Sequence, residues 1–128
     1  MSDDGQALVE FALVLPVLLL LAFAMVQLAD FGVARLALEH AAAEGARTGA
    51  LTNDDELIRD SIAAAANPLR ASEVQVDIVP SGAEVPRTGN PRGSLLRVHL
   101  RYVLPLVIPG LPALEARASA ARRIEWTP

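Results

Sequence analysis

The residues whose types and spacing favour chemistry lie near the start of the chain. Gly5 precedes Glu10 by five positions, and Gln6 opens an apolar stretch. A cut after Gly5 would create an ammonium group at Gln6, one helical turn from the Glu10 carboxylate, so that a charge pair could form within a chain or between neighbouring chains. The alternative is that Glu10 lies at a membrane surface and its side chain extends into water. The spacing alone is a weak motif, but it makes Gly5 and Gln6 a candidate processing site and Glu10 a candidate subunit-assembly residue.

Other residues with catalytic or metal-binding potential are few. The chain has no cysteine, which excludes a disulfide, a thiolate metal site and a cysteine nucleophile. The two histidines, His40 and His99, do not have metal-binding spacing, and the acidic residues 54–56 are better explained by helix capping. No nucleophile is paired with a base, so we expect no enzyme, no metal and no cofactor. Because the 15 acidic residues outnumber the 11 basic ones, nucleic acid is a disfavoured partner.

The elements that position these residues begin with an apolar segment over residues 7–29, in which only Glu10 and Gln27 are polar. A helix of about 20 residues at about 1.5 Å each crosses a hydrocarbon core of about 30 Å, so the segment is long enough to span a bilayer. A cleaved secretory signal is the alternative, because Ala22-Phe23-Ala24 matches a signal peptidase site. However, the first ten residues contain no Lys or Arg, and the apolar stretch continues past Ala24. We therefore predict a retained membrane helix.

Two strings in the N-terminal region resemble a known family. GQALVEFALVLPVLLLLAF, over residues 5–23, resembles the start of TadE-like minor pilins, or pseudopilins, of the tight-adherence (Tad, or Flp) pilus. AAAEGARTGA, over residues 41–50, is similar to the Ala-rich stretch that these proteins carry after the membrane helix. The resemblance implies a leader over residues 1–5 that a prepilin peptidase removes, a membrane helix, and a small extracytoplasmic head. The leader departs from the family pattern, because Asp3 and Asp4 stand where a basic residue is usual.

The resemblance also implies a location and partners. The protein would be a single-pass component of the cytoplasmic (inner) membrane, in contact with the lipid bilayer, other pilins and the pilus assembly machinery. The resemblance leaves open whether it also enters the pilus at the cell surface. Charge alone favours the opposite orientation, because no Lys or Arg precedes the helix and Arg35 follows it, which would leave the head in the cytoplasm. One arginine is a small excess, and the N-terminal ammonium offsets part of it. We therefore follow the resemblance.

Good helix formers continue beyond the membrane segment, and we expect one helix from Gln6 to about Thr48, within an N-terminal region over residues 6–50. A heptad-like repeat of small and apolar residues predicts one packed face on this helix. Small residues on such a face either admit another helix at close range or pack against the chain's own head, and the repeat leaves both open. The predicted face consists of Leu36, Ala37, Ala41, Ala43 and Ala50.

Residues 51–128 are predicted to form a small head. Asn53 is expected to cap a helix that runs to Ala66, before Asn67-Pro68. Two-residue periodicity predicts strands over residues 74–78, 96–104 and 114–126, the last with a bulge that shifts its phase toward Ile124. The fold class is therefore α+β: a long N-terminal transmembrane, pilin-like helix, then a short helix packed on a small three-stranded antiparallel sheet.

Between the last two predicted strands, residues 105–114 are apolar but contain three prolines and a glycine, which exclude a helix or a central strand. Their large apolar side chains either close the core of the head or form an exposed patch. Because a head of this size has limited room to bury them all, we predict that they contact a partner. These side chains are Leu106, Val107, Ile108, Leu111 and Leu114.

The function predicted from the sequence is that of a minor pilin, a structural and assembly component of a Tad-type adhesion pilus. Two other functions stay open. One is a secreted binding domain released by a cut after Ala24, and the other is a permanently anchored single-pass accessory subunit of another membrane complex. Neither alternative is enzymatic.

Overall fold

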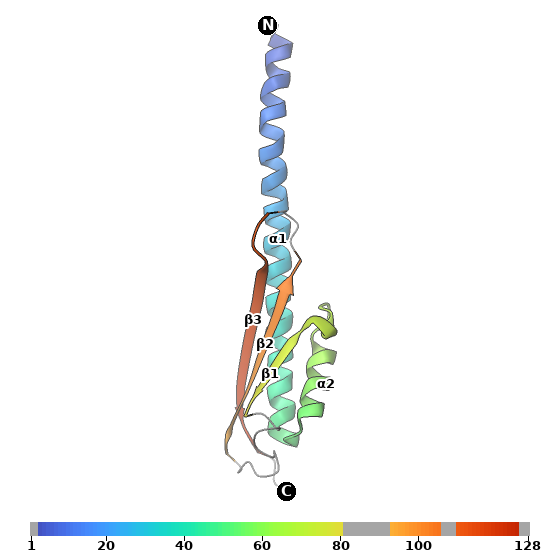
Figure 1. The fold of residues 1–128 in the computed structure, drawn as a ribbon, viewed down its shortest axis with the longest axis vertical. Helices are drawn as coiled ribbons and strands as arrows, with labels where there is room; N and C mark the ends of the chain where they lie inside the picture. The colour runs from blue at the N-terminus through green and yellow to red at the C-terminus, as the bar shows by residue number, and fades with distance from the viewer. Residues whose placement is uncertain (1–2, 81–92, 106–109, 126–128) are drawn as a thin grey trace.

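The computed structural model describes residues 3–80, 93–105 and 110–125. Helix α1 forms the long axis of the molecule, and its first half projects alone (Figure 1). The short helix α2 and the sheet pack on its second half (Figure 1), which confirms the predicted α+β class. The elements are α1 (Asp3–Thr52), α2 (Asp55–Ala65), the 3-10 helix η1 (Ala71–Glu73), β1 (Gln75–Val79), β2 (Leu95–Leu104) and β3 (Leu114–Arg123).

Helix α1 is longer than the sequence predicted, and at about 1.5 Å per residue it extends about 75 Å. Its first described residue is Asp3, and the acidic Asp3 and Asp4 of this first turn complement the positive helix terminus. At its other end Asn53 adopts a left-handed conformation with a φ of 51°, and its N–H donates to the Gly49 carbonyl over 2.9 Å. This is a helix C-terminal motif, so Asn53 ends α1.

The cap of α2 was therefore placed one residue too early by the sequence prediction. Asp54, not Asn53, is the N-cap, and its Oδ1 accepts hydrogen bonds from the N–H groups of Glu56 and Leu57 over 2.9 and 3.4 Å. Asp54 has the extended backbone conformation that is typical of an N-cap, so its side chain reaches the first N–H groups of α2. Asn53 instead has the left-handed conformation that ends α1. The buried face of α2 carries Ile58 and Ile62, which lie four residues apart and therefore on one side of the helix.

The sheet is antiparallel with the order β1-β2-β3, and β2 alternates buried and exposed residues along its whole length. The bulge predicted in the last strand is absent from the described residues. Pairing runs without interruption from Leu104 opposite Leu114 to Leu95 opposite Arg123, and the Ile124 N–H then donates to the Ser94 carbonyl over 2.9 Å. Ile124 lies an even number of residues from buried Ala116, so it reaches the core without a phase shift.

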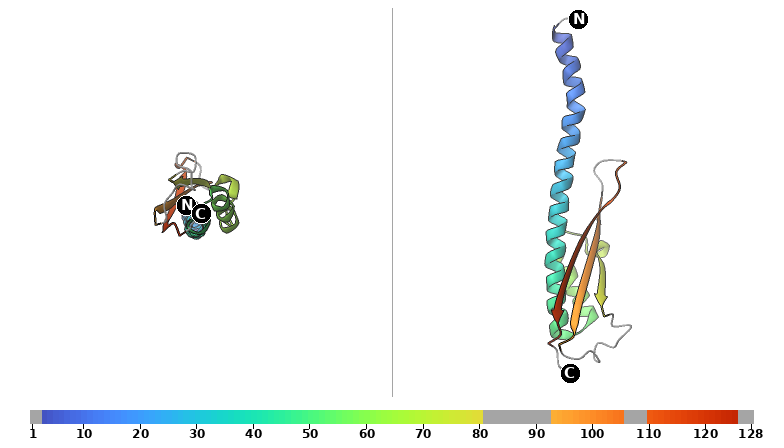
Figure 2. Two further views of the ribbon diagram at one scale, coloured as in Figure 1. Left: turned by 90° about the horizontal axis from the view of Figure 1, so that it is seen from below. Right: turned by 90° about the vertical axis from the view of Figure 1, so that its left-hand side faces the viewer.

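The core lies between the second half of α1, α2 and the inner face of the sheet. Two glycines of α1 bring these elements into close contact. A Cβ built on Gly45 would lie 2.6 Å from Ile62 Cγ1, and one built on Gly49 would lie 2.2 Å from Leu96 Cδ2. Seen along its axis, α1 is covered by the sheet and α2 on one side and is uncovered on the other side (Figure 2). The buried residues of α1 are Gln27, Ala34, Ala37, Leu38, Ala41, Ala42, Gly45, Ala46, Gly49 and Ala50.

The single packed face predicted for α1 was wrong, because its members divide between two faces. Ala37 and Ala41 are buried against the head, whereas Leu36 and Ala43 are exposed. A straight α-helix turns by 100° per residue, so adjacent positions such as 36 and 37 cannot share one narrow face. Ala50 is buried near the end of α1, where its carbonyl accepts a hydrogen bond from the Glu125 N–H.

Candidate functional site

The predicted processing and assembly residues lie in the first turns of α1, at the end of the molecule farthest from the head (Figure 1). Gln6 Nε2 donates a hydrogen bond to Glu10 Oε1 over 3.4 Å on the exposed helix surface. Residues four apart are neighbours on one side of a helix. A new N-terminus at Gln6 would therefore begin one turn from the Glu10 carboxylate.

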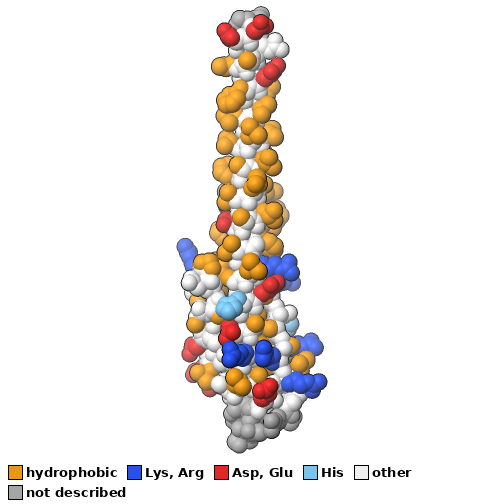
Figure 3. All heavy atoms as spheres, turned by 180° about the vertical axis from the view of Figure 1, so that it is seen from behind, with side chains coloured by type: hydrophobic (Ala, Val, Ile, Leu, Met, Phe, Trp, Pro, Cys, Tyr) orange, Lys and Arg blue, Asp and Glu red, His pale blue; other side chains and the backbone are white. Residues whose placement is uncertain are grey.

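The apolar segment of α1 is bounded by two acidic residues. No residue between Glu10 and Asp30 is charged, and residues 11–29 extend about 28 Å along a helix, close to the thickness of a hydrocarbon core. The most apolar stretch of α1 has none of its residues buried inside the structure. Hydrophobic side chains occupy this half of the helix in Figure 3 as well. Its length and composition suit a single membrane crossing.

In a membrane, the two acidic residues would limit the depth of this segment. A charged side chain at the bilayer centre costs about 2.5–3.5 kcal/mol on insertion scales, and the cost falls toward the interface. Sliding α1 in one direction draws Glu10 into the hydrocarbon, and sliding it in the other direction draws Asp30 in. The favoured position therefore places Glu10 at one edge of the core and Asp30 at the other.

Beyond Asp30, α1 carries a second apolar surface on the side that the head leaves uncovered. We call Val33, Leu36, Ala43 and Leu51 the outer stripe. Val33, Leu36 and Leu51 expose 51%, 69% and 53% of their surface. Their spacing places the four residues on one face of the helix, together with the polar His40 and Arg47. Figure 3 shows hydrophobic side chains among charged ones along this half of the molecule.

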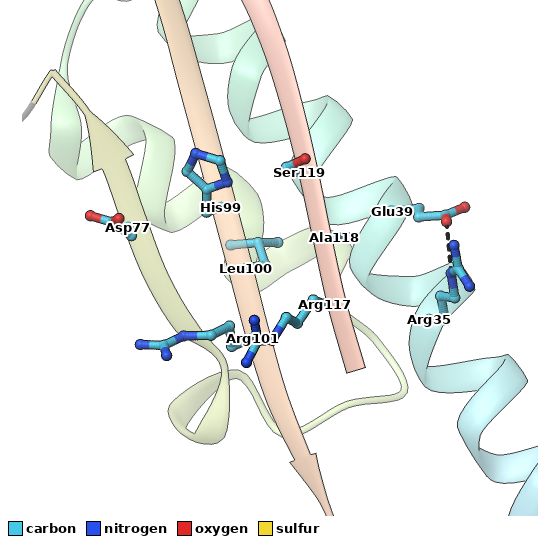
Figure 4. A pocket seen from close by; sticks show the side chains of 9 residues that line it. All are labelled: Arg35, Glu39, Asp77, His99, Leu100, Arg101, Arg117, Ala118 and Ser119. Carbon is cyan, nitrogen blue, oxygen red and sulfur yellow. Dashed lines mark hydrogen bonds and ion pairs between the residues drawn. The ribbon is translucent and has the colours of Figure 1, made fainter. Parts of the chain in front are cut away.

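An open hollow on the outer face of the sheet gathers polar side chains from four elements (Figure 4). The strand register places His99 between Asp77 of β1 and Ser119 of β3, and Arg101 opposite Arg117. Two exposed ion pairs lie at this face, Arg35 Nε to Glu39 Oε1 at 3.2 Å and Arg117 Nε to Glu115 Oε1 at 2.7 Å.

Exposed ion pairs of this kind contribute at most about 1 kcal/mol each. The hollow combines both signs of charge and is open to solvent, so its geometry corresponds to a hydrated sheet face. Across the described ranges, no group of three or more His, Asp and Glu side chains is arranged to hold a metal ion.

The predicted partner-contact residues fall in two groups. Leu106, Val107 and Ile108 lie outside the described residues, so contact through them stays a prediction. Leu111 and Leu114 are described and exposed, and they line an apolar hollow against α1. The Gln27 side chain joins the two segments, because its Nε2 donates to the Pro105 carbonyl over 3.4 Å. The other lining residues of this hollow are Ala24, Gln27, Leu28 and Phe31.

Comparison with known families matches residues 5–47 to the family model of TadE-like proteins. The chain carries a TadE-like segment. The match confirms the resemblance expected from the sequence and indicates a component associated with the Tad pilus system. No curated relative and no solved structure matches the chain. The TadE-like segment spans about a third of the 128 residues and ends inside α1, before α2 and the sheet begin.

The structure brings some predicted site residues together and separates others. Gly5, Gln6 and Glu10 share the first turns of the TadE-like segment. Leu111 comes from outside that segment but shares an apolar hollow with Ala24, which is about 21 Å along the helix from Glu10. The sequence analysis missed this shared hollow. Its one local signal was Gln27, a polar residue within an apolar segment.

Proposed function

We propose that this protein is a minor pilin, or pseudopilin, that acts as a structural and assembly component of a Tad-type adhesion pilus and not as an enzyme. In this proposal α1 anchors the chain in the inner membrane and the head is extracytoplasmic. A prepilin peptidase removes residues 1–5, and the helix then packs against other pilins of the same system. The TadE-like segment and the single apolar helix support this assignment.

The outer stripe is the observation that carries the proposal. One face of α1 is buried by the chain's own head, while the opposite face presents large apolar side chains beyond the membrane segment. Complete burial of a side chain such as Leu36 is worth about 1.5–3 kcal/mol, so a neighbouring helix that covers the stripe is stabilised by several such contacts. A helix that packs on its own head with one face and exposes apolar side chains on the opposite face is suited to bind the head and a second subunit at once.

Glu10 contributes the polar part of the proposed assembly. It lies in the same turns of the helix as Gln6, which becomes the N-terminal residue after processing. Among packed membrane helices, water is scarce and a carboxylate needs a partner of opposite charge. The ammonium group of Gln6, from the same chain or a neighbouring one, is that partner in our proposal.

N-terminal sequencing of the protein from the membrane fraction tests the proposed function against its alternatives. A minor pilin begins at Gln6, a secreted domain at Met25, and a permanently anchored subunit at Met1 or Ser2. The protein must be isolated from cells that express the rest of the pilus system, because the peptidase is part of it. A start at Met25, Met1 or Ser2 would contradict the proposal.

Gly5→Leu is expected to leave the leader attached. The substitution adds a bulky side chain immediately before the proposed cut, where glycine presents the smallest surface to a peptidase. Mass spectrometry of the mature protein measures the effect, and Ala12→Leu, which adds bulk farther along the same helix, is the matched control. The same mature mass for Gly5→Leu and the unmodified sequence would refute cleavage at this bond.

Glu10→Ala is expected to insert into the membrane at least as well as the unmodified chain, because it removes a charge from the edge of the hydrocarbon. It should nevertheless lose co-purification with the other pilins, since the Gln6 ammonium loses its partner. Glu39→Ala, at an exposed position of α1 outside the membrane segment, serves as the control. Undiminished co-purification of Glu10→Ala would show that Glu10 has no role in assembly.

A further inference from the structure

We infer that Leu111 and Leu114 contact the lipid acyl chains of the leaflet nearest the head, so that the head rests on the bilayer in addition to being attached to α1. The two residues lie where the connection between β2 and β3 returns into β3. They line the apolar hollow against α1 together with Ala24 and Leu28. The inference depends on the membrane crossing by α1 and not on the proposed pilin function.

The depth of the hollow follows from the position of the membrane segment. With Glu10 and Asp30 at the two edges of the hydrocarbon, Leu28 lies about 3 Å and Ala24 about 9 Å inside it on the head side. Leu111 lines the same hollow as these two helix residues, and on α1 the hollow extends from Ala24 to Phe31. A hollow with this position spans the edge of the hydrocarbon, so a side chain that lines it is close to the membrane surface.

The sequence of the connection suits this environment. Residues 102–114 contain no charged side chain, although charged residues flank them at Arg101 and Glu115. Prolines at 105, 109 and 112 also reduce the number of backbone N–H groups that need a partner in an apolar medium. The absence of charged side chains lowers the cost of placing the described residues Leu111 and Leu114 at the interface.

A hydrogen bond holds the start of the connection at the same depth. Gln27 is a polar residue within the membrane segment, and its Nε2 donates to the Pro105 carbonyl over 3.4 Å. Beside lipid, an unpaired Gln27 amide or Pro105 carbonyl would cost free energy. Their hydrogen bond therefore stabilises the observed position of the head relative to the membrane segment.

The position of the apolar hollow favours lipid acyl chains as the molecules that fill it. The hollow is continuous with the exposed apolar surface of the membrane segment, which acyl chains already surround at Ala24 and Leu28. The polar hollow of Figure 4 lies elsewhere on the head, on the outer face of the sheet, and does not interrupt this surface. A second protein subunit in the same place is the alternative that the experiment must distinguish.

Site-directed spin labelling of the full chain tests the inference, because the sequence contains no native cysteine. Leu111→Cys and Leu114→Cys are labelled in phosphatidylcholine vesicles at a low ratio of protein to lipid. Leu28→Cys is the lipid-facing reference. Leu95→Cys, at the opposite end of the sheet, is the water-facing control, since Leu95 and Leu111 expose comparable fractions of 44% and 52%. Collisions with oxygen report lipid, and collisions with a water-soluble nickel chelate report water.

We expect the ratio of oxygen to nickel accessibility at Leu111→Cys and Leu114→Cys to be several-fold higher than at Leu95→Cys and close to that at Leu28→Cys. A ratio equal to that at Leu95→Cys would overturn the inference. Low accessibility to both reagents would also overturn it, because it would place another protein surface over the hollow. These outcomes are independent of cleavage at Gly5 and of co-purification with pilins, so failure here would leave the proposed function standing.

Discussion

Gly49→Ala is expected to destabilise the head by about 1–3 kcal/mol, although alanine favours a helix over glycine by about 1 kcal/mol. The added Cβ would lie 2.2 Å from Leu96 Cδ2 and 2.8 Å from Ile58 Cδ1. Both neighbouring side chains are fully buried, so neither can move into solvent to make room. Overpacking at the junction of α1, α2 and β2 therefore outweighs the gain in helix propensity.

Pulse proteolysis of the full chain in detergent micelles, over a series of urea concentrations, measures this change as a lower midpoint of unfolding. Gly32→Ala is the matched control, because a Cβ at Gly32 meets no atom within 4 Å. The same substitution in the same helix should there be neutral or slightly stabilising. An unchanged midpoint for Gly49→Ala would show that the glycine contact does not limit the packing of the head.

Leu36→Glu is expected to weaken association with other pilin subunits by at least about 100-fold, which corresponds to about 2.8 kcal/mol. In the proposed assembly the outer stripe is covered by another helix, and a carboxylate at position 36 would lose its contact with water. The head itself should keep its stability, because Leu36 is exposed and faces away from the core.

Co-purification from cells with the complete pilus system measures the loss, and urea pulse proteolysis verifies that the head is still folded. Leu57→Glu, which places the same charge at an exposed apolar position on α2, is the control for a general effect of surface charge. Normal co-purification of a folded Leu36→Glu chain would show that the outer stripe does not bind other pilin subunits, and would contradict the proposed function at that point. It would not affect the contact of Leu111 with lipid.

The two experiments examine opposite faces of one helix. Gly49 belongs to the face of α1 that binds the chain's own head, and Leu36 belongs to the outer stripe. We expect Gly49→Ala to lower the stability of the head, and we expect Leu36→Glu to weaken assembly while the head stays stable. These two results together would establish that the two faces act separately. The sequence repeat alone did not make this distinction.

Features that depend on local sequence were predictable from the sequence. The membrane segment follows from an uncharged stretch whose length matches a bilayer. The strand β2 follows from strict alternation, because successive side chains of a strand point to opposite faces. The start of a helix near residue 54 follows from a cluster of capping residues, although the exact cap depended on how α1 ends at Asn53. The roles of Gly5, Gln6 and Glu10 in processing and assembly stay predictions from their spacing and from the family resemblance.

Tertiary structure decided which surfaces meet. Alanine and glycine are compatible with either face of α1, so only packing of the head showed that Ala37 turns inward while Leu36 stays exposed. Gln27 and Pro105 are 78 residues apart in the chain, and no local pattern relates them. Their contact depends on β2 running back along α1 toward the membrane segment (Figure 1), and Leu111 and Ala24 then line one hollow. Local periodicity limits the faces that an element offers, and long-range packing selects the partner that each face meets.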